Sequence, residues 1–396
     1  MTHKLVPQKT WLACAVILWL AAACSLPSNP GPTVTAAALE PTPTVTESPA
    51  PTPTALPILP QPLYYLSGRS GSQQVWRLER DGLTQTQITS EGSDVISFDI
   101  SPADGSVAYV SANQLYLAAA DGSNRRLLVD NAAADAQAAD YYTTQQLSDV
   151  HFSSDGRILA YAFNGLWVAD LVTFQANHVL ANQVQTRENG NIVLKNYYAP
   201  LLWAPEDQLV LITTGNAQSS ALAILELAAE PRVIKLETNL ACCHAAWAPD
   251  GSSLLVADPF IGLVEPGLWR YAAATGEQTA LFATEDNGVL HFAGWPLQLA
   301  DGSLYYFYAT AAEAPGGDVP LYMVRSALDG VNGRTQLRPE AFSNLTEALW
   351  AEDGSLALLV QARPDGGPGG AVLLAAAGDS QLQLLLEDGH RLTWGQ

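Results

Sequence analysis

The most informative feature of this 396-residue chain is a pattern that recurs seven times, at intervals of 44 to 55 residues. Each copy is a short apolar run that ends in an aromatic or aliphatic residue, which we call the marker. An Asp-Gly turn follows several of the markers, most clearly in residues 246–251 (AWAPDG). The markers are Ile100, Phe152, Trp203, Trp247, Trp295, Trp350 and Trp394. A repeat of this length, built from short strands, is typical of β-propellers, in which four-stranded blades surround a central axis.

Apolar runs after the markers predict the second strand of each blade, as at 158–163 and 356–360. A Leu-Tyr or Leu-Trp pair, such as residues 166–167, indicates the third strand. Asp-Gly at 121–122 and 329–330 then turns the chain into an outer strand, because glycine supplies the positive φ that tight hairpins require. Many of these runs are apolar on both faces, which fits sheets that are covered on both sides by neighbouring blades.

The two ends of the repeat region complement each other. Residues 62–89 contain a second, third and fourth strand but no first strand, whereas residues 391–395 resemble a first strand with nothing after it. Pairing the two pieces would close a ring without an unpaired edge. We therefore predict an all-β fold, a seven-bladed β-propeller closed by pairing of the C-terminal strand with the N-terminal blade. Six or eight blades are the alternatives if one copy, such as the weak one at Ile100, is misassigned.

The repeated element is an aromatic residue, Ser or Ala, Pro-Asp-Gly, an apolar strand and then Leu-Tyr or Leu-Trp. It resembles the TolB-like and WD-repeat-like propellers of exported bacterial proteins, most closely at residues 247–251. The pattern weakens at Trp295, where Asp-Gly arrives late, and at Trp203, where Glu-Asp replaces Asp-Gly. The resemblance covers residues 62–396. It implies binding of a protein or ligand at one end of a central channel, and it implies no common reaction.

The N-terminal residues read as an export signal. Lys4 and Lys9 precede an apolar run, residues 10–23, that is too short for an ordinary membrane-spanning helix. Small residues before Cys24 resemble a bacterial lipobox, although Ala21 replaces the usual larger aliphatic residue. We therefore expect a signal peptide over 1–23 and lipid attachment at Cys24. An ordinary cleavage site with an incidental cysteine, or an uncleaved anchor, is the alternative.

Residues 24–61, from the lipidated cysteine onward, are rich in Pro and Thr and have almost no charge. Such a segment cannot bury a core and favours extended polyproline II, at about 3.1 Å per residue. We expect a disordered stalk that connects the lipid to the propeller at 62–396. The predicted location is the outer face of a bacterial membrane.

The formal net charge of −21 opposes binding to nucleic acid, which requires a cationic surface. It also opposes electrostatic adhesion to anionic lipids, so the acyl chain would be the only link to the membrane. The chain has four cysteines, too few for a disulfide scaffold of this length. We expect a body that is monomeric and has a large core of its own.

Motifs for catalysis are missing from the sequence. Residues 68–72 fail the Gly-x-Ser-x-Gly pattern of a serine hydrolase at its last position. The glycine-rich residues 366–370 lack the Lys and Ser or Thr of a phosphate loop. We therefore expect no catalytic residues and no cofactor. The predicted role is non-catalytic binding of an unknown protein, peptide or cell-envelope glycan.

A set of polar residues lies three to five positions before the markers, near the expected start of the innermost strands. We predict that they form a binding rim at one mouth of the channel. His, Cys and carboxylate side chains are also ligands for zinc or copper. Their spacing is dispersed, so we expect no metal, and His244, His291 and His390 are the only candidates for one. A metal-dependent binder or hydrolase-type enzyme that uses this rim is the alternative function. The rim residues are His390, His291, His244, Cys242, Cys243, Glu347 and Asp149.

Cys242 and Cys243 are adjacent in the sequence. Their Cα atoms would lie about 3.8 Å apart, below the usual disulfide range of about 4.4–6.8 Å. A vicinal disulfide would therefore be strained. The sequence does not distinguish between such a disulfide and two buried thiols.

Overall fold

The computed structural model describes residues 57–138, 140–188, 192–216, 219–236, 244–258, 266–312, 319–378 and 381–396. These residues form 29 β-strands and one short π-helix, η1 (Tyr141–Gln145). Within these ranges, no helix has the length and apolar character needed to cross a membrane. The expected signal peptide, Cys24 and most of the stalk lie outside the described residues, as do Cys242 and Cys243. The predicted all-β class is confirmed.

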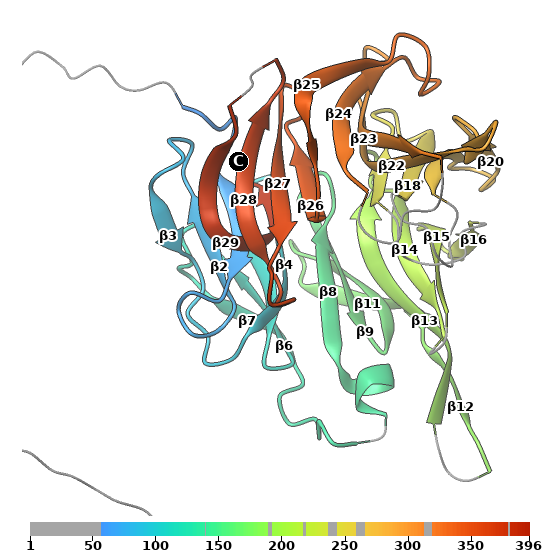
Figure 1. The fold of residues 1–396 in the computed structure, drawn as a ribbon. Coiled ribbons are helices and arrows are strands. Elements are labelled where there is room, and N and C mark those ends of the chain that lie inside the picture. Colours follow the sequence, from blue (N-terminus) through green and yellow to red (C-terminus); the bar gives the residue numbers. More distant parts are fainter. Residues whose placement is uncertain are drawn as a thin grey trace, which may run out of the picture. The chain divides into compact units, whose positions relative to one another are not determined.

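The strands follow one another as antiparallel neighbours, and we call each group of successive strands a repeat (Figure 1). Repeat 1 contains β1 (Leu63–Ser67), β2 (Gln74–Leu78) and β3 (Gln85–Gln87). Repeat 2 contains β4 (Val95–Ile100), β5 (Val107–Ser111), β6 (Gln114–Ala118) and β7 (Arg126–Asp130). Repeat 3 contains β8 (Leu147–Phe152), β9 (Ile158–Phe163), β10 (Gly165–Asp170) and β11 (Gln175–Ala181). Repeat 4 contains β12 (Gln183–Thr186), β13 (Ile192–Trp203), β14 (Leu209–Gly215), β15 (Ser220–Glu226) and β16 (Arg232–Lys235).

The second half of the chain continues in the same way. Repeat 5 contains β17 (His244–Trp247), β18 (Ser253–Asp258), β19 (Gly267–Ala272) and β20 (Gln278–Ala280). Repeat 6 contains β21 (Glu285–Asp286), β22 (Val289–Gln298), β23 (Leu304–Ala311), β24 (Leu321–Ser326) and β25 (Thr335–Phe342). Repeat 7 contains β26 (Leu345–Trp350), β27 (Leu356–Ala362), β28 (Gly370–Ala376) and β29 (Gln383–Trp394). The expected second and third strands are therefore present in every repeat.

The C-terminal strand β29 belongs to two repeats. Its first part pairs with β28, with Leu386 opposite Val372, and its last part pairs with β1, with Trp394 opposite Leu63. Repeats 7 and 1 thus share one seven-stranded sheet, in the order β26-β27-β28-β29-β1-β2-β3. The sequence predicted only a short strand at 391–395. The strand begins earlier because the preceding apolar run already pairs with β28 as an outer strand.

The Asp-Gly turns have one geometry throughout. In the turn after β6, Gly122 has φ +82°, and a Cβ atom there would lie 2.2 Å from the carbonyl oxygen of Ile88. The Oδ1 of Asp121 accepts a hydrogen bond from the N–H of Ser123 at 2.9 Å. Each residue of the dipeptide therefore has its own role. The glycine adopts the positive φ of the turn, and the aspartate accepts a hydrogen bond from the backbone N–H that follows the glycine. The same aspartate contact occurs at Asp104, Asp155, Asp250, Asp301 and Asp353.

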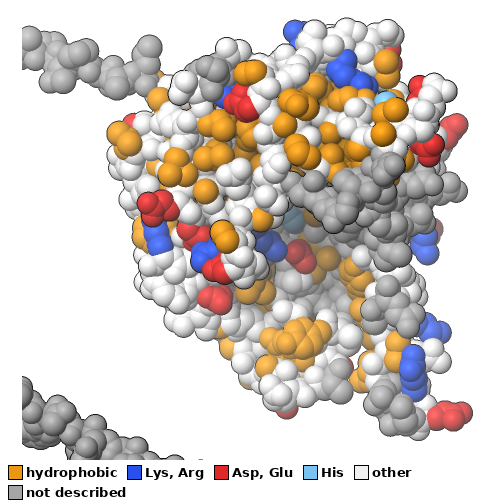
Figure 2. Space-filling model, viewed as in Figure 1, with side chains coloured by type: hydrophobic (Ala, Val, Ile, Leu, Met, Phe, Trp, Pro, Cys, Tyr) orange, Lys and Arg blue, Asp and Glu red, His pale blue; other side chains and the backbone are white. Residues whose placement is uncertain are grey.

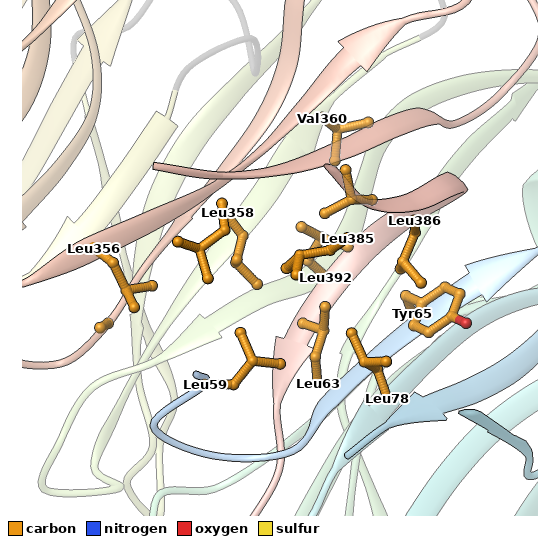
Figure 3. Close-up of a cluster of buried hydrophobic side chains, with 13 residues drawn as sticks. Leu59, Leu63, Tyr65, Leu78, Leu356, Leu358, Val360, Leu385, Leu386 and Leu392 are labelled. Atoms are coloured by element: carbon orange, nitrogen blue, oxygen red, sulfur yellow. The ribbon is translucent and has the colours of Figure 1, made fainter. Parts of the chain in front are cut away.

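The core consists of separate apolar layers between repeats. Among the described residues there are seven clusters of buried apolar side chains, and each joins two repeats. Six of them join repeats that follow one another in the chain. The seventh joins repeat 7 to repeat 1, where Leu358 and Val360 lie in one cluster with Leu63 and Tyr65 (Figure 3). Leu59 belongs to this cluster too, so the packed body includes residues just before position 62.

Four of the marker tryptophans donate the indole N–H to the strand that carries the preceding marker. The indole N–H of Trp350 donates to the backbone carbonyl of Trp295 at 2.8 Å, and that of Trp394 donates to Trp350 at 2.7 Å. Trp203 and Trp247 make the corresponding contacts, at 3.0 and 3.3 Å, with carbonyl groups of repeats 3 and 4. These four tryptophans therefore lie at interfaces, and each indole N–H is hydrogen-bonded across the interface.

We predict that Trp350→Phe lowers the free energy of unfolding by about 1–3 kcal/mol, because it leaves the buried carbonyl of Trp295 without a donor. Trp76→Phe is a matched control, since the Nε1 atom of Trp76 is buried and has no hydrogen-bond partner among the described residues. Chemical denaturation of both variants isolates the hydrogen bond from the change in ring size. Equal losses of stability in the two variants would contradict this role for the markers.

Candidate functional site

Residues from five strands and the turns beside them line one hollow of about 450 Å³, which we call the marker hollow. It lies at the marker ends of β4, β8, β13, β26 and β29, and it also includes parts of the turns after β4 and β8. Figure 2 shows that this side of the molecule is hollowed near its middle, with charged side chains of both signs nearby. Segments far apart in the sequence thus meet at one site, as expected for a propeller.

The residue immediately before the marker borders the hollow in all five of these strands. Successive side chains of a strand leave opposite faces, so a marker that packs into the core leaves its predecessor on the other face. These residues are Asp99, His151, Leu202, Leu349 and Thr393.

β-Bulges bring two further side chains into the marker hollow. The pairing of β13 with β14 shifts register between Pro200 and Leu202, and the intervening Leu201 is 36% exposed. In β29, Arg391 has φ +50°, next to a register shift in the pairing with β1. A bulge redirects the side chain of its extra residue, and a strained backbone conformation persists only where neighbouring groups hold it.

Glu347 in β26 holds the strained backbone at Arg391. The N–H groups of Arg391 and Leu392 donate to Oε2 and Oε1 of Glu347, at 2.8 and 2.5 Å. The guanidinium of Arg391 donates to the Oγ of Ser97 at 3.3 Å and forms no salt bridge within the described part of the chain. The carboxylate therefore fixes the backbone, while the cation stays available at the wall of the marker hollow.

Burial raises the pKa of Glu347 from 4.5 to about 7, against the opposing effect of the two backbone N–H groups and the charge of Arg391. The carboxyl group is therefore part protonated near neutral pH.

Asp99 and His151 form the other polar side of the marker hollow. Asp99 accepts backbone hydrogen bonds from Phe152 at 2.7 Å and from Ile100 at 2.9 Å, and burial raises the pKa of its carboxyl group. The Nδ1 of His151 lies 3.8 Å from Oδ2 of Asp99, which is too long for a hydrogen bond. Asp99 thus ties repeat 2 to repeat 3, and the ring of His151 remains at the hollow.

Two serines line the same hollow, but both hydroxyl groups have other partners. Ser153 donates to Asp155 at 2.7 Å, and Ser154 donates to the carbonyl of Pro205 at 2.7 Å. A serine nucleophile requires a base within hydrogen-bond reach, and neither hydroxyl is bonded to His151. The arrangement can bind a polar group, but it is not set up for acyl transfer.

The three histidines of the predicted rim have different surroundings. His244 stacks on Trp295 with ring centroids 3.9 Å apart, and burial lowers its pKa to about 3. His291 in β22 lies beside Tyr308, with 2.6 Å between Nδ1 and the phenol oxygen. His390 in β29 lies opposite Leu66, and its pKa is lowered by burial and then by the charge of Arg391. Among the described residues, no group of three or more His, Cys, Asp or Glu could hold a metal ion.

The remaining rim residues also separate. Glu347 contacts the backbone beside His390, as described above. Asp149 has φ +39° at the bulge in β8, and its charge acts on the hydroxyl group of Tyr197. Cys242 and Cys243 lie outside the described residues. Within the described residues, Glu347 and the segment that carries His390 are the parts of the rim that the structure shows in contact.

The predicted rim comprised His, Cys and carboxylate residues three to five positions before the markers, so it omitted Asp99 and His151 because of their position and Arg391 because of its residue type. His151 and Asp99 lie one position before theirs, and Arg391 lies three before Trp394. Alternation along the strand was the signal that could have found the first two. The bulge that exposes Arg391 has no sequence pattern of comparable strength.

The chain matches no protein-family model and no curated protein. It is similar to several solved structures. An oligogalacturonate lyase from Vibrio parahaemolyticus is 10% identical, with coverage of 83% of this chain and 85% of that chain and a TM-score of 0.51. A puromycin-hydrolysing peptidase from Mycobacterium tuberculosis is 13% identical, with coverage of 84% and 52% and a TM-score of 0.55. TolB from Acinetobacter baumannii is 12% identical, with coverage of 82% and 79% and a TM-score of 0.43.

At these identities the similarity concerns the fold alone. The similar structures include TolB proteins and other β-propeller folds, and the β-propeller expected from the sequence rests on those with TM-scores above 0.5.

Proposed function

We propose that this protein is a lipid-anchored, exported binding module that holds an extended segment of a protein partner in its marker hollow. The proposal rests on the convergence of side chains from five strands on one hollow of about 450 Å³. The module is non-catalytic in this proposal, because both serine hydroxyls at the hollow are bonded to groups other than His151.

The proposal includes a closed ring of seven blades. Its support is that each of the seven repeats shares an apolar cluster with the next, and that repeat 7 shares one with repeat 1. Pairing of β29 with β1 supplies the innermost strand that repeat 1 lacks in its own sequence. In such a ring the marker hollow would lie at one end of the central channel.

The chemistry of the walls suggests the class of segment. Leu201, Leu349, Leu392 and Trp394 supply apolar surface, and Arg391 supplies a cation that forms no salt bridge with the described residues. An apolar side chain beside an Asp or Glu would complement both features, because it fills the apolar wall and pairs the guanidinium with a carboxylate. Nucleic acid is a poor match for a chain with a net charge of −21.

Export and anchoring are proposed from the sequence of residues 1–61. The basic and apolar N-terminus, Cys24 and the Pro/Thr-rich stalk would present the propeller away from the membrane surface. The partner would then be another protein of the cell envelope or an exported protein.

A photo-crosslinking amino acid at position 201, introduced in intact cells, tests this function. We expect an adduct with a discrete protein partner, and we expect Arg391→Gln to reduce its yield at least about tenfold, as for loss of a charge-assisted hydrogen bond. Arg363→Gln is the matched control, because Arg363 lies outside the hollow and pairs with Asp365 at 2.9 Å. A crosslinker at Val172, which is 70% exposed, controls for random encounters.

Fractionation of the same cells tests the location. The protein is expected with membranes, and the Cys24→Ala protein is expected in the exported soluble fraction. An adduct that forms equally at positions 201 and 172, or one that persists unchanged in Arg391→Gln, would count against the marker hollow as the binding site.

A further inference from the structure

A second hollow, of about 530 Å³, lies on repeat 6 and shares no lining residue with the marker hollow. We call it the tyrosine–arginine hollow. Its walls come from β23, β24 and β25, the strands at the upper part of Figure 1. Figure 2 shows hydrophobic side chains gathered over this region, with Lys or Arg atoms beside them. The residues used below are Tyr308, Thr310, Tyr322, Arg334 and Gln336.

Strand register places the two tyrosines side by side. Tyr308 in β23 pairs with Tyr322 in β24, and Tyr306 pairs with Val324 on the same face. Tyr306 and Val324 are buried in the cluster shared with repeat 5. Tyr322 is 38% exposed. This face of the sheet is therefore covered at one end, and it presents aromatic surface at the other.

Arg334 brings an unneutralised cation to the same face. Its Nε donates to the hydroxyl of Tyr306 at 2.7 Å and to the carbonyl of Gly330 at 3.1 Å, and its guanidinium lies 3.9 Å from the ring centroid of Tyr308. These partners are all neutral, and Arg334 forms no salt bridge with any described residue. The neighbouring Arg325, in contrast, has Asp301 at 3.8 Å. In a chain with a net charge of −21, an arginine that is oriented by neutral groups retains its capacity to pair with an anion.

His291, on the same face of the neighbouring strand β22, fixes the tyrosine wall from the side. Its Nδ1 lies 2.6 Å from the hydroxyl of Tyr308, and Phe282 packs against both rings. A wall held in this way loses little side-chain entropy when a ligand binds. His291, which the sequence placed in the channel rim, thus supports a different site.

We infer that the tyrosine–arginine hollow binds an acidic sugar. The C–H face of a sugar ring can pack on Tyr322, and a carboxylate or phosphate can form a charge-assisted hydrogen bond with Arg334. Thr310 and Gln336 provide polar groups for sugar hydroxyls. A neutral sugar or an apolar peptide would remove water from the Arg334 guanidinium without supplying an anion to pair with it, which costs free energy. The anion can be a uronic carboxylate or a sugar phosphate, since both fit a guanidinium.

Isothermal titration of the purified full chain tests this inference with three probes: a glucuronic acid tetrasaccharide, a glucose tetrasaccharide and a phosphate-bearing tetrasaccharide. We expect binding of one or both acidic probes and at least about tenfold weaker binding of the neutral one. Arg334→Gln and Tyr322→Ala should each weaken the acidic probe about tenfold. Arg325→Gln, on the neighbouring strand, should leave the affinity unchanged.

The two acidic probes distinguish a uronic acid from a sugar phosphate as the ligand. Tyr322→Ala keeps the test decisive if Arg334→Gln proves unstable, because the Tyr322 side chain is exposed and its loss should spare the core. Failure of both acidic probes to bind, equal affinity for the neutral probe, or full affinity in Tyr322→Ala would each overturn the inference. None of these outcomes bears on the marker hollow, which shares no residue with this site.

Discussion

Removal of residues 391–396 is expected to abolish cooperative folding of the whole body, although it removes only the last part of one strand. These residues pair with β1, and without them β1 loses the neighbour that lies opposite Leu63 and Tyr64. In the proposed ring this pairing is the closure, so its loss would leave two exposed sheet edges.

The size of the effect follows from what the deletion takes away. Leu392 is 6% exposed within the apolar cluster of repeats 7 and 1, and Trp394 packs against that cluster and bonds to Trp350. Loss of a buried Leu costs about 2–5 kcal/mol, and loss of the partly buried Trp394 costs up to the about 3–5 kcal/mol of a fully buried Trp. The deletion also removes the backbone N–H groups of Arg391 and Leu392, which donate hydrogen bonds to Glu347. The total, on the order of 10 kcal/mol, is comparable with the whole stability of a typical domain, about 5–15 kcal/mol.

Near-ultraviolet circular dichroism and denaturant titration of the truncated chain measure this effect. Deletion of Gln396 alone is the control, because that residue is exposed and lies beyond the pairing with β1. A truncated chain that still unfolds in one sharp transition, at a denaturant concentration close to that of the full chain, would refute the closed ring.

The sequence predicted the fold well because the fold depends on local and repeated features. Each Asp-Gly turn requires only a glycine with positive φ and an aspartate whose oxygen meets the next N–H, as at Asp121 and Gly122. Each marker needs only to be large and apolar, and a tryptophan such as Trp350 adds one hydrogen bond. These requirements recur with the repeat, so they can be recognised from one chain.

The site could be predicted less well because it depends on departures from the repeat. Arg391 reaches the marker hollow through a bulge that Glu347 holds from another strand, and neither feature has a local pattern. His291 lies in the expected position along its strand, but Tyr308 and Phe282 engage it within repeat 6. Tyr308 and Tyr322 become neighbours only when the register of β23 and β24 is known.

Protonation of Glu347 should make the stability of the protein fall as the pH rises from about 5 to about 8. The pKa of this carboxyl group is about 7 in the folded protein and 4.5 ordinarily, so the folded state binds its proton more tightly than the unfolded state does. Its contribution is fully present below about pH 4.5 and is lost as the pH rises through about 7. At about 1.4 kcal/mol for each pKa unit, the loss between pH 5 and 8 amounts to roughly 2–3 kcal/mol.

Glu347→Gln isolates this contribution, because glutamine fills the same space and keeps one oxygen that can accept from Arg391 or Leu392. Denaturant unfolding at about pH 5 and about pH 8 should show that the wild type loses roughly 2–3 kcal/mol more than the variant. Glu352→Gln, an exposed change in the same repeat, controls for the loss of one negative charge. If Glu347→Gln and the wild type have parallel pH profiles, the carboxyl group is ionised throughout this range. In that case the two backbone N–H groups, rather than burial, determine its charge.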